Sequence, residues 1–383
     1  MAASGNRRAK LAALVLAALA LATSAHAGTS KFKDPDDGAF DMSGWLSTRT
    51  GFFPVLTPIT EPAVGYGAAL TLAFFHGGTL EGATGAPPGP SGRTVPTTMS
   101  GIGGMATENG SWGAYLGQLG YYQHDRWRLA GLIAKTSLNL DYFTPNDRAF
   151  AFNMESWVVY QELTRRVGKT DLFAGARFVY LDNDILFEAD NLPPDISAPP
   201  AFDVTDVGLG VVAEFDTRDN TLSPSRGFNL KAAGMFMGSW LGGDNDYQNY
   251  SVAAKSYFAV HPRLVLSARV QGAAIADEPP FYARPYVLMR GIPRLRYQGD
   301  QVASLDGEVR WDVYQRWWLV GFGGVGWTHT DFELLEKEDD QVVGAGGLGF
   351  RYLIARRLGL LTGLDVARGP EEFALYVVVG SSI

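Results

Sequence analysis

The sequence predicts an all-β protein, a closed antiparallel transmembrane β-barrel of about 16 strands. The first observation is that short segments of alternating apolar and polar residues recur along the chain, which is the period of a strand with two different faces. The second is that several segments carry two or more charges on the polar face and Leu, Val, Phe or Tyr on the other, as a wet lumen and a lipid exterior require. The third is that no stretch after residue 27 approaches 18 consecutive apolar residues, and a membrane protein without helices must close into a barrel.

Residues 1–27 have the pattern of an export signal. A basic start is followed by the apolar run 11–22 and by the small-x-small cleavage site Ala25-His26-Ala27. The run is too short to span a bilayer, which takes about 20 apolar residues, so a retained anchor is the weaker alternative. We expect residues 28–48 to form a short polar leader and residues 49–383 to form the barrel, with no room for another folded domain.

Sixteen segments have the strand pattern, and an even number is expected of a bacterial barrel. They are residues 49–57, 63–75, 96–106, 112–122, 127–141, 150–164, 170–183, 203–216, 226–240, 247–259, 263–274, 301–314, 316–329, 341–353, 357–367 and 372–381. A soluble β-propeller is the alternative for such a pattern, but it would show blade repeats near 40 residues, and the sequence has none.

The alternation is clear within individual segments taken in order. The apolar face of 150–164 carries Phe152, Met154, Val158 and Tyr160, and that of 203–216 carries Leu209, Val211, Ala213 and Phe215. The segment 301–314 places Asp306, Glu308, Arg310 and Asp312 on one face and Leu305, Val309, Trp311 and Val313 on the other. These faces predict a charged lumen wall and a lipid-facing exterior.

The connections should alternate between the two sides of the membrane. Those after odd-numbered segments should include the long outer loops, at 184–202, 275–300 and 330–340, and those after even-numbered segments should be short periplasmic turns, such as 165–169. The Gly/Pro-rich stretch 76–95 does not fit this rule, because it is long and yet follows the second segment.

The composition argues against several classes of function. The net charge is −8 and no basic patch is present, which argues against a nucleic-acid partner. The chain has no cysteine, so it has neither a disulfide framework nor a thiolate metal site. The histidines after the export signal are widely spaced, and His329 lies between two threonines instead of beside a serine. We expect no enzyme activity, no cofactor and no metal site.

A polar motif connects the eighth and ninth segments. It reads Asp216-Thr-Arg218-Asp219, with Pro224 and Gly227 following. Aspartate side chains accept bonds from nearby backbone N–H groups, proline restricts φ, and glycine admits close approach, so the motif predicts a tight structural turn.

A second motif, Arg290-Gly291, lies in the long connection before 301–314. Together the two motifs resemble the BamA/TamA family, also called bacterial surface antigens, whose members are barrels of the Gram-negative outer membrane. The resemblance covers the barrel only, roughly residues 50–383, and the periplasmic POTRA domains usual in the family are expected to be absent. Ile383 also departs from the aromatic residue that usually ends such barrels.

The resemblance implies that the loop at 275–300 folds back into the barrel and that Arg290 pairs with acidic residues of the lumen wall. Glu308 matches the glutamate that the family carries on this wall. Gly324 replaces the aspartate expected on the next strand, so Asp306 or Asp312 could compensate for it. In the alternative, Arg290 and its neighbours Arg284, Arg294 and Arg296 are surface residues that face lipopolysaccharide phosphates.

The resemblance implies a role in inserting barrel proteins into the membrane or in translocating chains through it. The expected partners are outer-membrane lipids, lipopolysaccharide and client outer-membrane proteins. Two alternatives stay open from the sequence: a passive pore or small-solute or lipid conduit, and a structural surface protein.

Overall fold

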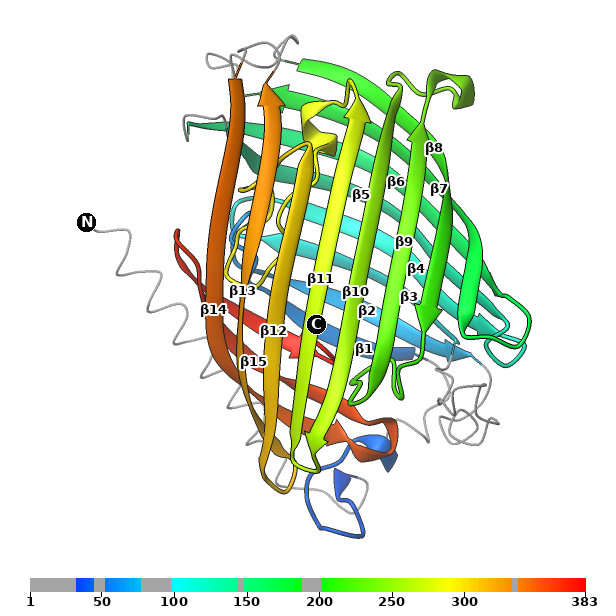
Figure 1. Cartoon of the computed structure of the whole chain (residues 1–383), viewed down its shortest axis with the longest axis vertical. Helices are drawn as coiled ribbons and strands as arrows, with labels where there is room; N and C mark the ends of the chain where they lie inside the picture. Colours follow the sequence, from blue (N-terminus) through cyan, green and yellow to red (C-terminus); the bar gives the residue numbers. More distant parts are fainter. Residues whose placement is uncertain (1–31, 45–51, 77–97, 144–147, 188–200, 333–336) are drawn as a thin grey trace.

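Sixteen strands form one antiparallel sheet that curls into a nearly closed barrel, in which each strand pairs with the next one along the chain (Figure 1). This is a computed structural model, and it describes residues 32–44, 52–76, 98–143, 148–187, 201–332 and 337–383. The predicted fold class and the count of sixteen strands are confirmed. The predicted signal at 1–27 lies outside the described residues.

The strands are β1 (Phe52–Ile59), β2 (Gly67–His76), β3 (Thr98–Thr107), β4 (Trp112–Tyr122), β5 (Trp127–Phe143), β6 (Ala149–Arg166), β7 (Leu172–Phe187), β8 (Ala201–Asp216), β9 (Gly227–Met237), β10 (Tyr247–His261), β11 (Leu264–Asp277), β12 (Gln301–Tyr314), β13 (Trp317–Phe332), β14 (Lys337–Ala355), β15 (Leu360–Arg368) and β16 (Phe373–Val379). The bounds of β4 and β12 coincide with the predicted ranges. The end of β16 comes two residues early because Gly380 has a φ of +85° and turns the chain.

On β8 and β12 the two faces of the sheet carry the side chains that the sequence pattern predicts, but on β6 the prediction is reversed. Phe152, predicted on the lipid-facing side, is 5% exposed inside the barrel because it packs against Phe281 of the connection 278–300, and Trp157 on the opposite face is 49% exposed.

On β12, Glu308 and Arg310 are each 3% exposed and point into the lumen, while Val309 between them is 43% exposed on the outside. The same alternation leaves Leu348 on β14 73% exposed on the exterior. An apolar exterior around a charged lumen is the arrangement of a membrane barrel.

The connections lie on two sides of the barrel. One side, here the turn side, has tight connections such as 262–263 and 315–316. The other, the loop side, includes the long connection 278–300, which contains the short helix η4 (Phe281–Ala283). The predicted loop 330–340 is shorter than expected, since β13 and β14 leave only 333–336 between them. Of the stretch 76–95, only His76 at the end of β2 is among the described residues, so the unusual connection expected there lies outside them.

No helix among the described residues is both long and apolar enough to cross a membrane. The two other short helices, η3 (Ser239–Leu241) and η6 (Arg356–Leu358), occupy connections between strands.

The exterior face predicts a depth-dependent cost for charge. Val309→Arg near the middle of β12 should lower the free energy of unfolding in a bilayer by about 2–4 kcal/mol. The control Tyr314→Arg, at the end of the same strand where the side chain is 65% exposed, should cost about 0–1 kcal/mol. Denaturant unfolding in phospholipid vesicles measures both, and equal costs would contradict a lipid-facing exterior.

Candidate functional site

The barrel has a seam where the two ends of the sheet meet. The strand order places β1 and β16 at its two ends, and they approach each other without a hydrogen-bonded ladder between them in the part of the chain that the structure describes. Both strands are short, with eight and seven residues. Pro54 and Pro58 in β1 lack N–H donors, and proline belongs on an edge strand for that reason. The barrel is therefore nearly closed, where the sequence predicted a closed one.

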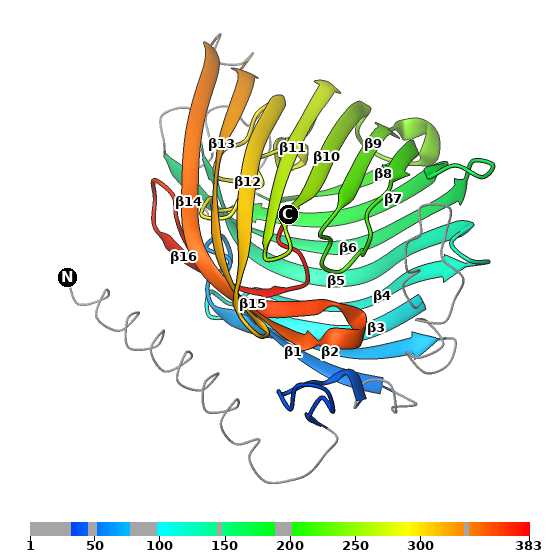
Figure 2. The same cartoon turned by 60° about the horizontal axis from the view of Figure 1, so that its bottom comes forward.

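The lumen loop, residues 278–300, reaches both sides of the seam from inside the barrel (Figure 2). The backbone N–H of Gly291 donates to the Tyr376 hydroxyl on β16 at 3.0 Å. Arg294 lies against Glu61, directly after β1, with its backbone N–H at 3.1 Å from a carboxylate oxygen. Side-chain and backbone contacts of this loop thus link the two sides of the seam, where no backbone ladder joins β1 to β16.

Arg290 is held by several groups at once. Its Nη2 lies 2.8 Å from a carboxylate oxygen of Glu308, and its Nη1 lies 2.6 Å from Asp365 on β15. The guanidinium stacks on the Phe322 ring, with its carbon 3.6 Å from the ring centroid. Arg351 on β14 donates two hydrogen bonds to the same aspartate, at 2.6 and 2.9 Å. We call these residues, together with Ser382, the loop cluster; its members are Arg290, Glu308, Phe322, Arg351, Asp365 and Ser382.

The motif's glycine is required by the position of the backbone. Gly291 has a φ of +91°, a region that other residues rarely occupy, and an added Cβ would lie 3.1 Å from Ala345. The turn in the chain at Gly291 directs Arg290 at the lumen wall.

The carboxylate that joins Glu308 in holding Arg290 is Asp365, and this corrects the expectation that Asp306 or Asp312 takes that place. Asp306 pairs instead with Arg269, at 2.9 Å. Asp312 sits at the turn-side end of β12, where its backbone N–H bonds to the Arg263 carbonyl.

Gly324 has a steric reason to lack a side chain. A Cβ there would lie 2.6 Å from the sulfur of Met289 and 2.6 Å from the Cβ of Asp306. The methionine before Arg290 therefore fills the space that the family's aspartate would need. A single sequence gives no signal for Asp365, because its strand follows much later in the chain.

The other loop arginines are also paired within the barrel. Arg284 lies 3.3 Å from Asp300, and Arg296 lies 3.5 Å from Glu371. The Arg294 side chain, 54% exposed, lies 3.4 Å from Glu61. These contacts disfavour a set of arginines that all face outward toward lipopolysaccharide.

The turn motif forms a compact, hydrogen-bonded turn between β8 and β9. Asp219 accepts bonds from the backbone N–H groups of Asn220, Ser225 and Arg226. Gly227 has a φ of +105°, and a Cβ there would lie 2.4 Å from the Thr217 carbonyl oxygen. The carbonyl of Pro224 accepts a bond from the Arg310 guanidinium, which connects the turn to the charged wall of β12.

Asp216 and Arg218 belong to a buried ionic group on the turn side. Asp216 is fully buried and lies 2.8 Å from Arg218 and 3.1 Å from Arg128 on β5. Arg128 and Arg166 both stack on Phe173, at 3.6 and 4.4 Å from its centroid. Sequence reasoning missed Arg128, Arg166 and Phe173, since each looks like an ordinary strand residue.

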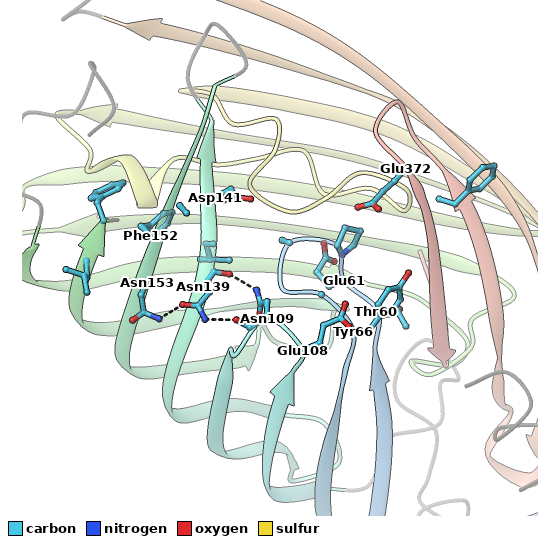
Figure 3. Close-up of a pocket in the computed structure, with 18 residues that line it drawn as sticks. Thr60, Glu61, Tyr66, Glu108, Asn109, Asn139, Asp141, Phe152, Asn153 and Glu372 are labelled. Carbon is cyan, nitrogen blue, oxygen red and sulfur yellow. Dashed lines mark hydrogen bonds between the residues drawn. The ribbon is translucent and has the colours of Figure 1, made fainter. Parts of the chain in front are cut away.

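A cavity of about 630 Å³ lies on the loop side beside the seam (Figure 3). Its wall includes Glu61, which follows β1, and Glu372, which precedes β16. The Asn109 and Asn139 side chains each donate to the other's backbone carbonyl at 2.9 and 2.8 Å, and the Asn139 side-chain oxygen accepts from Asn153 at 2.8 Å. In the described residues no group of three or more His, Cys, Asp or Glu side chains is arranged to hold a metal ion.

Residues 32–44 of the polar leader lie on the turn side. Arg316, in the turn between β12 and β13, pairs with Asp34, Asp37 and Asp41 at 2.6, 2.8 and 2.6 Å. The backbone N–H of Arg357, between β14 and β15, donates to Ser43. Since β1 begins at residue 52, the leader attaches the chain before β1 to turns on the far side of the seam.

Comparison with known proteins matches residues 108–284 to the Omp85 superfamily domain. BamA from Haemophilus ducreyi lacking POTRA domains 1–3 shares the fold, with a TM-score of 0.59 and 11% identity over 87% of this chain and 70% of that one. CdiB from Escherichia coli has a TM-score of 0.55 and 12% identity over 85% of this chain and 61% of that one. CdiB from Acinetobacter baumannii has a TM-score of 0.54 and 8% identity over 86% and 59%. No curated protein sequence matches the chain.

An antiparallel sixteen-stranded barrel with an apolar exterior and a charged lumen defines the class of the transmembrane β-barrels. Within it, the match of residues 108–284 to the Omp85 superfamily domain and the fold shared with BamA and CdiB support a BamA/TamA-like Omp85 barrel. These matches imply the Gram-negative outer membrane as its location. The chain spans about 60% of the length of the two CdiB chains.

The geometry predicts a strong coupling between Arg290 and Glu308. The two side chains are 11% and 1% exposed, and removing one partner of a well-buried pair costs about 3–5 kcal/mol because the other charge is stranded. Arg290→Ala and Glu308→Gln should each raise protease cleavage of the lumen loop. In a double-mutant cycle of unfolding free energies the two effects should be non-additive. Additive effects near 0–1 kcal/mol would indicate a solvated pair of little consequence.

The leader should detach in acid. A hydrogen bond from Arg316 lowers the pKa of Asp37 below its ordinary value of 3.8. Burial alone would raise the pKa of Asp41, but bonds from Ser43, Arg356 and Arg316 outweigh it and lower that pKa. Both carboxylates therefore stabilise attachment above pH 3.8, and this stabilisation is lost as the pH falls through the lowered pKa values. Protease protection of residues 32–44 should persist at pH 7, disappear well below pH 4, and be absent at pH 7 in Arg316→Ala.

Proposed function

We propose that the protein inserts or translocates other proteins at the outer membrane by opening along the β1–β16 seam. The single observation that carries this proposal is the seam itself: two short strand ends that approach without a ladder in an otherwise continuous sheet. A free strand edge can pair with an incoming strand through main-chain hydrogen bonds, which is how extended segments add to sheets.

The contacts that hold the seam can be broken without disrupting the rest of the barrel. They come from the lumen loop, through Tyr376 and Glu61, and from the leader on the turn side. Side-chain contacts of this kind are weaker in sum than a ladder of eight residues such as the one between β1 and β2. The seam is therefore the line along which the barrel opens.

The filled lumen argues against a passive pore. The lumen loop lies inside the barrel, and the turn between β8 and β9 reaches β15, where the Leu361 N–H donates to Ser223 at 3.3 Å. A solute conduit needs a continuous water-filled path, which these segments obstruct.

The partners follow from the two surfaces. The apolar exterior fits outer-membrane lipids and the lipid part of lipopolysaccharide, and the seam fits the strand edges of client outer-membrane proteins. An export signal at 1–27 would bring the chain to this membrane, with the turn side in the periplasm and the loop side outside.

Locking the seam tests the proposal. The chain has no cysteine, so paired cysteines introduced into β1 at residues 54–57 and into β16 at residues 375–378 can form only the intended disulfide. Oxidation should abolish insertion of a client barrel into vesicles, and reduction should restore it, because a strand can enter only through an open edge.

A cysteine pair within an existing ladder is the matched control. Leu72→Cys with Ile102→Cys links β2 to β3, which face each other in register. This lock should leave insertion unchanged. Full insertion activity from the seam-locked barrel would exclude opening at this seam, and channel conductance that persists in both locked forms would favour the passive pore.

A further inference from the structure

The chain ends inside the lumen. After β16, the N–H of Gly380 donates to the Leu361 carbonyl at 2.7 Å, and residues 380–383, the C-terminal tail, enter the ring of strands (Figure 2). Ile383 is only 2% exposed, so its apolar side chain is removed from water. The tail continues directly from the strand that forms one edge of the seam.

The tail is held from the opposite wall. The hydroxyl of Tyr257 on β10, itself 2% exposed, donates to a main-chain oxygen of Ile383 at 2.6 Å. Among the described residues, this hydroxyl bonds to the tail and makes no hydrogen bond to the lumen loop. The Tyr257 hydroxyl therefore holds the tail without a hydrogen bond to the lumen loop in the described residues.

Ser382 belongs to the loop cluster and uses its full hydrogen-bonding capacity there. Its hydroxyl donates to Glu308 at 2.5 Å and accepts from Arg290 at 3.1 Å and from Arg351 at 3.0 Å. A serine hydroxyl offers one donor and two acceptor lone pairs, so all three are occupied. Two of the three partners, Arg290 and Glu308, also bond to each other.

We infer that the C-terminal tail is a built-in ligand of the loop cluster, and that it couples release of the lumen loop to movement of β16 at the seam. The inference rests on the proposed function for its purpose, since it states how that seam is kept shut. If Arg290 leaves the cluster, Ser382 loses a partner and the tail is held less firmly. By thermodynamic reciprocity, freeing the tail must loosen the loop to the same degree.

The test uses a change that removes a hydrogen bond to the tail and none to the lumen loop. Tyr257→Phe removes one hydroxyl and preserves shape, so the barrel should fold. In the purified full chain in vesicles without any client, protease cleavage of the lumen loop should rise about tenfold, equivalent to about 1.4 kcal/mol. A spin label at Val379→Cys, an exterior position 57% exposed at the end of β16, should become more mobile.

Two further variants complete the test. Ser382→Ala should raise both readouts, and combined with Tyr257→Phe it should add less than the sum of the two. Arg290→Ala should increase label mobility at residue 379 although Arg290 lies on the loop. The matched control is Tyr160→Phe, which removes a lumen hydroxyl bonded to Glu162, away from the tail, and should alter neither readout.

The outcomes separate this inference from the proposed function. Unchanged loop cleavage in Tyr257→Phe, or unchanged label mobility in Arg290→Ala, would overturn the coupling whatever the barrel does with clients. Coupling observed in a barrel that inserts no client would support this inference and contradict the proposed function.

Discussion

The unpaired edges of β1 and β16 are the constraint on which the rest of this structure depends. Backbone N–H and C=O groups left open in hydrocarbon cost several kcal/mol each, which is why membrane barrels normally close completely. Here the prolines of β1 remove two donors, so that edge has fewer groups to satisfy. The remaining attachment comes from the lumen loop and the C-terminal tail inside the barrel and from the leader on the turn side.

Arginine and carboxylate pairs supply most of this attachment. In the loop cluster, Asp365 is fully buried and accepts hydrogen bonds from two guanidinium groups. These charge-assisted bonds compensate the charge that the carboxylate carries away from water. Such pairs give little net stability over apolar packing, yet breaking one leaves a stranded charge at high cost. A cluster of this kind therefore favours two discrete arrangements, intact or fully released, over gradual loosening. That property suits the proposed opening of the seam.

The residues that depart from the family pattern fit together in the structure. Met289 occupies the room above Gly324, and the second carboxylate for Arg290 comes from β15. β15 is the neighbour of the seam strand, so the arginine now bonds to the flank of the seam as well as to β12. Ile383 departs as well: its apolar side chain lies buried, and the Tyr257 hydroxyl bonds to its main-chain oxygen.

The period of two in the sequence was enough to predict the fold class, the sixteen strands and the charged face of β12, because alternation follows directly from strand geometry and from a medium that differs on the two sides. The two motifs pointed to the turn at 216–227 and to Arg290 with Glu308. The pairing of Arg290 with Asp365, the entry of Ser382 into the cluster and the open seam were decided by tertiary structure. The two contacts of Arg290 join residues 75 and 92 positions apart, and the seam brings together the first and last strands of the sheet. A local sequence pattern does not indicate which distant strands will face each other across a lumen.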